Sequence, residues 1–88
     1  MMMYYDDDMK RRLRRAEGQI RGVLKMMEEG KHCKDVVTQL SAVRSAVDKT
    51  IAHVVAVNLE KCIIEQQELG QGTHEVVREA VQLLIKSR

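Results

Sequence analysis

"CKDVVTQLSAVRSAVDKTIAHVVAVNLEKCIIEQQE", residues 33–68, is the stretch that decides the fold. It contains neither glycine nor proline, and its valine, leucine and isoleucine residues recur at the three- and four-residue spacing of one helix face. Gly70 and Gly72 follow shortly after, and glycine commonly stands just past a helix C-terminus. The sequence therefore predicts one unbroken helix from about Cys33 to about Glu68.

Shorter helices are predicted on both sides of this long one. Asp6, Asp7 and Asp8 precede an apolar pattern that ends at Gly30, and acidic residues at a helix start are stabilised by the positive end of the helix dipole. Thr73 has the side chain of an N-cap and opens a third pattern. Residues 1–5 are interpreted as a loose tail. The predicted fold is all-α, with three helices of which the central one is long. The first apolar stripe comprises Leu13, Ala16, Ile20, Val23, Leu24 and Met27, and the third comprises Val76, Val77, Ala80, Leu83 and Leu84.

The composition predicts a single domain over residues 1–88 with a thin core. The chain has no tryptophan or phenylalanine and only two tyrosines, so its core depends on aliphatic residues and methionine. Small chains bury a small share of their surface, and we therefore expect an oligomer to complete the burial. Gly18 and Gly22 interrupt the first helix, and close packing against a neighbour would explain them.

The chain is predicted to be cytoplasmic. Its start, "MMMYYDDD", is acidic where a secretion signal is basic, and no apolar run approaches the roughly 20 residues that span a membrane. In that compartment two cysteines are more often reactive or metal-binding than joined in a permanent disulfide. No set of catalytic residues and no cofactor loop stands out, so the sequence predicts no enzyme.

Cys33 and Cys62 lie on the same side of the long helix, because 29 residues at about 100° each nearly complete a whole number of turns. Asn58 lies on that side too. The rise of about 1.5 Å per residue separates the two cysteines by roughly 43 Å, far beyond disulfide reach. They can meet only between chains, with two copies of the helix antiparallel about a two-fold axis. The alternative is that both are inert buried thiols.

Basic residues are concentrated in the first predicted helix, with Glu17 as the one acid among them. A basic helix face is often only a solvated surface, and a second interpretation is a surface for phosphates. The uneven distribution of charge favours the second. The residues are Lys10, Arg11, Arg12, Arg14, Arg15, Arg21 and Lys25.

"RLRRAEGQIRGVLKMMEEGKHCKDVVTQLSAVRSAVDKT", residues 12–50, resembles the copper-sensing operon repressor family, CsoR/RcnR. The arginine-rich start, "EGQIRG", "CKDV" and "QLSAVRSA" carry the likeness, which extends over nearly the whole chain. It implies a helical homodimer in the form of an antiparallel four-helix bundle and a homotetramer that is a dimer of dimers. It also implies a repressor that releases double-stranded operator DNA when an inducer binds.

The resemblance implies an inducer site made of Cys33 from one chain with Asn58 and Cys62 from the other. Copper sensors of the family have histidine where this chain has Asn58, and a neutral amide is a poor partner for Cu(I). The pattern is similar to the persulfide-sensing, CstR-like branch, in which the cysteines become persulfidated and then bridged. Persulfide or polysulfide is therefore the expected inducer, with no cofactor. The alternative is a metal-responsive repressor in which Cys33 and Cys62 bind Cu(I) linearly. His32, His53 and His74 are interpreted as surface or non-ligating residues.

The same resemblance implies a DNA-binding face on the first two helices. Its arginine and lysine residues would pair with phosphates, and Gln19 would touch a base edge. Arg44 has an alternative role in an internal ion pair. A different class remains open, a helical interaction protein in which the basic face only aids solubility. The implied DNA-binding positions are Arg12, Arg15, Gln19, Arg44 and Lys49.

Overall fold

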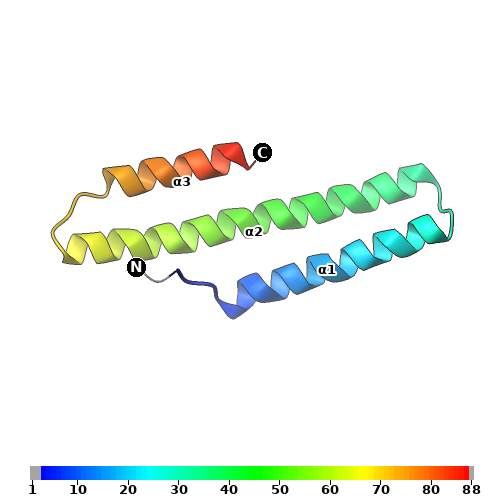
Figure 1. The fold of residues 1–88 in the computed structure, drawn as a ribbon, viewed down its shortest axis with the longest axis horizontal. Helices are drawn as coiled ribbons and strands as arrows, with labels where there is room; N and C mark the ends of the chain where they lie inside the picture. Colours follow the sequence, from blue (N-terminus) through cyan, green and yellow to red (C-terminus); the bar gives the residue numbers. More distant parts are fainter. Residues whose placement is uncertain (1–2, 88) are drawn as a thin grey trace. The chain divides into compact units, whose positions relative to one another are not determined.

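The computed structural model describes residues 3–87 and has three helices (Figure 1). They are α1 (Asp7–Glu28), α2 (Cys33–Glu68) and α3 (His74–Lys86). Across residues 3–87 there is no β-strand. The all-α prediction is confirmed, and α2 runs without interruption over the range that the sequence predicts. Cys33 is its first residue.

The ends of α1 and α2 follow from their local sequence. Asp6 is the N-cap of α1, where its Oδ1 accepts a hydrogen bond from the Met9 N–H at 2.8 Å. Gly30 and Gly70 both have positive φ, 68° and 73°, which glycine adopts without steric penalty. At Gly30 the helix closes with two backbone bonds, from Gly30 to the Met27 carbonyl and from Lys31 to the Met26 carbonyl. The same pair of bonds recurs at Gly70.

The chain separates into two compact units, each of which contains one half of α2. The first unit is residues 6–50, and the second consists of the described parts of residues 1–5 and 51–88. In the first unit α1 returns alongside the N-terminal half of α2, and in the second α3 lies along its C-terminal half (Figure 1). The prediction of a single domain stays a prediction.

The core of the unit 6–50 has a seven-residue repeat on both helices. A repeat of seven keeps the buried positions on one line of each helix, as expected for two helices packed lengthwise. The one polar member, Thr50, is satisfied because its Oγ1 donates to the Ala46 carbonyl at 2.9 Å. The buried residues are Met9, Ala16 and Val23 of α1 and Val36, Val43 and Thr50 of α2.

Much of the predicted stripe of α1 is not buried. Only Ala16 and Val23 of it are in the core, whereas Leu13, Ile20, Leu24 and Met27 are exposed. The physical reason is that α1 has one neighbour in its unit, and one neighbour covers only part of an apolar face. A Cβ added at Gly18 or Gly22 would meet no atom within 4 Å, so the close packing expected there is absent among the described residues. Such a face fits the predicted oligomer, which stays a prediction.

The second unit has a smaller core, in which Cys62 and Ala80 are buried. Thr73 holds the N-cap position of α3, but its side chain makes no capping hydrogen bond, with φ −109° and ψ 0°. The prediction of Thr73 as a capping side chain is therefore wrong, although the position is correct. Over residues 3–87, none of the helices combines the length and apolar character needed to cross a membrane.

Candidate functional site

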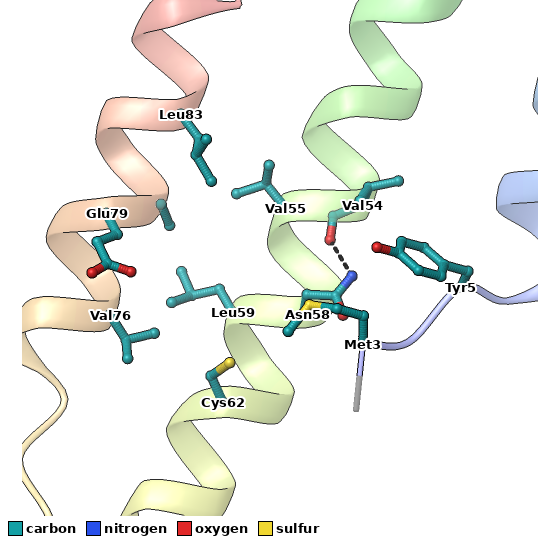
Figure 2. Close-up of a pocket in the computed structure, with 11 residues that line it drawn as sticks. Met3, Tyr5, Val54, Val55, Asn58, Leu59, Cys62, Val76, Glu79 and Leu83 are labelled. Atoms are coloured by element: carbon teal, nitrogen blue, oxygen red, sulfur yellow. Dashed lines mark hydrogen bonds between the residues drawn. The ribbon is translucent and has the colours of Figure 1, made fainter. Parts of the chain in front are cut away.

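A pocket of about 340 Å³ surrounds Cys62 within the second unit (Figure 2). α2 forms one wall and α3 the other, and Met3 and Tyr5 of the N-terminal segment line a third side. Cys62 is 8% exposed, so its thiol faces the pocket more than bulk solvent. The lining residues from the helices are Val54, Val55, Asn58, Leu59, Cys62, Val76, Glu79, Ala80 and Leu83.

Asn58 stands one turn before Cys62, and its side-chain amide is fully engaged. Its Oδ1 accepts a hydrogen bond from the Tyr4 N–H at 2.7 Å, and its Nδ2 donates to the Tyr4 carbonyl at 2.9 Å. The same Nδ2 donates to the Val54 carbonyl at 2.8 Å (Figure 2). Both amide hydrogens are therefore used. Asn58 acts as a clamp on the backbone of Tyr4 rather than as an available ligand.

The clamped segment, residues 3–5, is named the strap below. Its second contact is between Tyr4 and Lys61, whose Nζ lies 4.6 Å from the centre of the tyrosine ring. A cation at this distance from an aromatic face is attracted to it. The expectation of a loose tail is thus not met at Tyr4, whereas residues 1 and 2 of that tail lie outside the described residues.

Cys33 is exposed at the first position of α2 and does not line the Cys62 pocket. Beside it, His32 accepts a hydrogen bond at Nδ1 from the Lys34 N–H at 3.1 Å, so its ring caps the helix. The structure brings Asn58 and Cys62 together in one pocket of one chain. Cys33 is not part of that group.

The pocket offers sulfur rather than nitrogen donors. Met3 contributes a thioether and Cys62 a thiol, while His32, His53 and His74 do not line it. Across residues 3–87, no three side chains of the His, Cys, Asp or Glu type gather closely enough to hold a metal ion. Soft sulfur donors suit Cu(I), and the pocket supplies two of them, the Met3 thioether and the Cys62 thiol.

The predicted DNA-contacting residues all lie in the unit 6–50 and differ in availability. Arg15, Arg44 and Lys49 are exposed, and within residues 3–87 Arg44 makes no ion pair. Arg12 is already bonded to Asp8, with Nε 2.8 Å from Oδ2. Arg44 and Lys49 stand about 140° apart around α2, so they do not share one face of a single chain.

Gln19 is the residue whose placement fits its predicted role least. It lies three residues after Ala16, about 60° from the buried line of α1. Its Oε1 is buried and has no hydrogen-bond partner among the described residues. Contact with a base edge through that oxygen requires the side chain to turn outward.

The strap is the part of the site that sequence reasoning missed. Its contact with Asn58 spans 54 positions, so no local pattern predicts it. One signal was available: Tyr4 and Tyr5 are the only aromatic residues of the chain, and both fall in the segment interpreted as loose. Aromatic residues of this size usually find a surface to pack on.

The family follows from a match over nearly the whole chain. The family model described as metal-sensitive transcriptional repressor matches residues 5–86. The chain belongs to this family. The resemblance to CsoR/RcnR repressors is therefore confirmed. A metal-sensitive transcriptional repressor of this family is a regulator and not an enzyme, as the sequence predicts.

Individual relatives span most of this repressor. YrkD of Bacillus subtilis (strain 168), an uncharacterised protein, is 52% identical over 63 residues, which are 72% of this chain and 100% of that protein. The copper-sensing transcriptional repressor RicR of Mycobacterium tuberculosis (strain H37Rv) is 41% identical over 84% of this chain and 78% of its own length. The copper-sensing transcriptional repressor CsoR of Bacillus subtilis (strain 168) is 31% identical over 80% of this chain and 69% of its own.

A solved structure shares the fold of this repressor. The nickel-responsive transcriptional regulator InrS superposes with a TM-score of 0.78 at 27% identity. The match covers 100% of this chain and 98% of that one. InrS therefore has the same overall fold as this chain.

Proposed function

We propose that this repressor senses reactive sulfur through Cys33 of one chain and Cys62 of another, and releases operator DNA when the two become bridged. The observation that carries the proposal is the placement of the two thiols on one unbroken helix, with Cys33 exposed at its start and Cys62 buried near its other end. A continuous helix keeps residues 29 positions apart far beyond disulfide reach. A bridge therefore has to join two chains.

The exposed apolar side chains support an assembly in which two chains pair. The described residues bury few large side chains, and Leu13, Ile20 and Met27 remain exposed along α1 at seven-residue intervals. A homodimer with antiparallel α2 helices covers such faces and brings Cys33 of one chain to Cys62 of the other. Two dimers then form the homotetramer, in the cytoplasm of the cell.

The two thiols differ in accessibility, which orders the chemistry. The exposed Cys33 thiolate attacks the sulfane sulfur of a persulfide and takes that sulfur, and the donor leaves as a thiolate. The Cys62 thiolate of the partner chain then attacks the inner sulfur of the Cys33 persulfide. A disulfide forms and hydrosulfide leaves. Bridges with more sulfur atoms require further sulfane sulfur.

The engaged state of Asn58 favours sulfur chemistry over a metal at this site. Its Oδ1, the amide atom that would bind a metal, accepts a hydrogen bond from the Tyr4 N–H at 2.7 Å. A bridge between two thiols needs nothing from this amide, whereas a metal site would gain no strong ligand from it.

Cu(I) is the second candidate inducer. The named relatives RicR and CsoR are copper-sensing repressors, and the pocket of this chain adds the Met3 thioether to the Cys62 thiol. Two thiolates from two chains bind Cu(I) linearly without an imidazole.

Operator binding with each inducer distinguishes the two candidates. We expect the reduced protein to bind DNA from its own promoter region with a steep salt dependence, because phosphate contacts release counterions. Fluorescence anisotropy should show at least a tenfold loss of affinity after persulfide treatment. Cu(I) added with a competing chelator should have a smaller effect. Release by stoichiometric Cu(I) and unchanged binding after persulfide would assign the site to the metal instead.

A further inference from the structure

We propose that the strap, residues 3–5, is a gate that selects by size which thiol reagents reach Cys62. The inference rests on the proposed function: the closed strap shields Cys62 from bulky reagents, and it has to open when Cys62 attacks the Cys33 persulfide of the other chain. Small sulfane sulfur species pass the gate, and bulky disulfides or electrophiles do not. Asn58 is the positioning residue that keeps the gate closed.

The strap stands between the pocket and solvent. Met3 and Tyr5 line the pocket on one side while 46% and 57% of their surfaces face solvent. Figure 2 shows both side chains on the side of α2 away from α3. With the strap in place Cys62 is only 8% exposed. Removing the strap leaves that side of the pocket without a wall.

The pocket is large enough for a small sulfur species behind the strap. Its volume of about 340 Å³ compares with about 30 Å³ for one water molecule in the liquid. A hydrodisulfide or a low-molecular-weight persulfide fits such a space. The proposed selection depends on the size of the reagent and leaves the thiol chemistry of Cys62 unchanged.

The strap is held by few contacts, which makes it able to open. Its polar anchors are the two hydrogen bonds between Tyr4 and Asn58, at 2.7 and 2.9 Å, and the Lys61 cation over the Tyr4 ring. Both hydrogen bonds go to the backbone of Tyr4, so Asn58 holds the course of the strap and not one particular side chain. Each such bond makes only a modest net contribution to the free energy that holds the strap in place, and the loss of both is enough to open it.

The test measures alkylation of Cys62 by two maleimides that share one reactive group and differ in size. In a Cys33→Ala background Cys62 is the only thiol of the chain. N-ethylmaleimide is the small reagent and a polyethylene glycol maleimide is the bulky one. Asn58→Ala removes both hydrogen bonds to Tyr4. Tyr4→Pro changes the strap instead of α2, and it removes the N–H that donates to Asn58.

We expect both substitutions to raise the rate of the bulky reagent about tenfold and that of the small reagent about twofold or less. Gln67→Ala, an exposed amide on α2 outside the pocket, is the matched control and should change neither rate. Equal acceleration of both reagents would indicate general loosening and would contradict a size gate. Unchanged rates for both reagents would contradict it as well. The assay uses neither DNA nor persulfide, so its outcome is independent of whether the proposed sensing occurs.

Discussion

Cys33→Ala and Cys62→Ala should each leave operator binding by the reduced protein intact and abolish its release by persulfide. A bridge needs both thiols, so the loss of either one removes the whole response. The wild-type affinity should fall at least tenfold on treatment, whereas that of either variant should change less than twofold. Fluorescence anisotropy with promoter DNA, before and after persulfide, measures both quantities on one sample.

The two cysteine variants should differ in the chemistry that remains. Cys62→Ala keeps the exposed Cys33, which should still take up sulfane sulfur and stop at the persulfide. Cys33→Ala keeps only the thiol behind the strap and should react more slowly. If either variant released DNA on persulfide treatment, bridging of the two thiols would not be the event that causes release. Faster sulfur uptake at Cys62 than at Cys33 would reverse the proposed order.

Arg15→Ala should weaken operator binding by about tenfold or more, because each chain of an oligomer repeats the loss. The salt dependence should become shallower by about 0.9 in log–log slope for each phosphate contact removed. Arg12→Ala should have a smaller effect than Arg15→Ala. Arg12 must give up its 2.8 Å bond to Asp8 before it can contact a phosphate, and that loss offsets part of the gain.

Arg78→Ala is the control for charge in this experiment. Arg78 lies on α3 outside the predicted DNA face and pairs with Glu75 at 3.0 Å. Its replacement by alanine lowers the net charge by the same amount as Arg15→Ala does. Its effect on affinity should be less than twofold. If it weakens binding as much as Arg15→Ala, the interaction with DNA is non-specific attraction to a basic protein, and the predicted face is wrong.

The backbone of this fold could be predicted from local chemistry. The absence of glycine and proline between Cys33 and Glu68, with glycine at 70, is enough to define α2. Acidic residues stand at the start of α1, as the sequence predicts, and Asp6 is its N-cap. These features depend on neighbours within a few positions, which the sequence displays directly.

Burial and the strap could not be predicted in the same way. Helical spacing identifies the apolar face of α1 but not how many partners cover it, and therefore Ala16 is buried while Leu24 is exposed. Helical spacing puts Asn58 on the Cys62 side of α2, yet its partner Tyr4 lies 54 positions away. Helical periodicity carries no information about such a contact.

Mixed variants reveal whether the two thiols of one site belong to two chains. Cys33→Ala chains and isotopically labelled Cys62→Ala chains would be mixed, exchanged under reducing conditions, treated with persulfide and examined by intact mass spectrometry without reductant. We predict covalent heterodimers with one Cys62–Cys33 bridge, no linked species from either variant alone, and doubly bridged dimers from the wild type. Wild-type monomers that carry an internal Cys33–Cys62 bridge would contradict it.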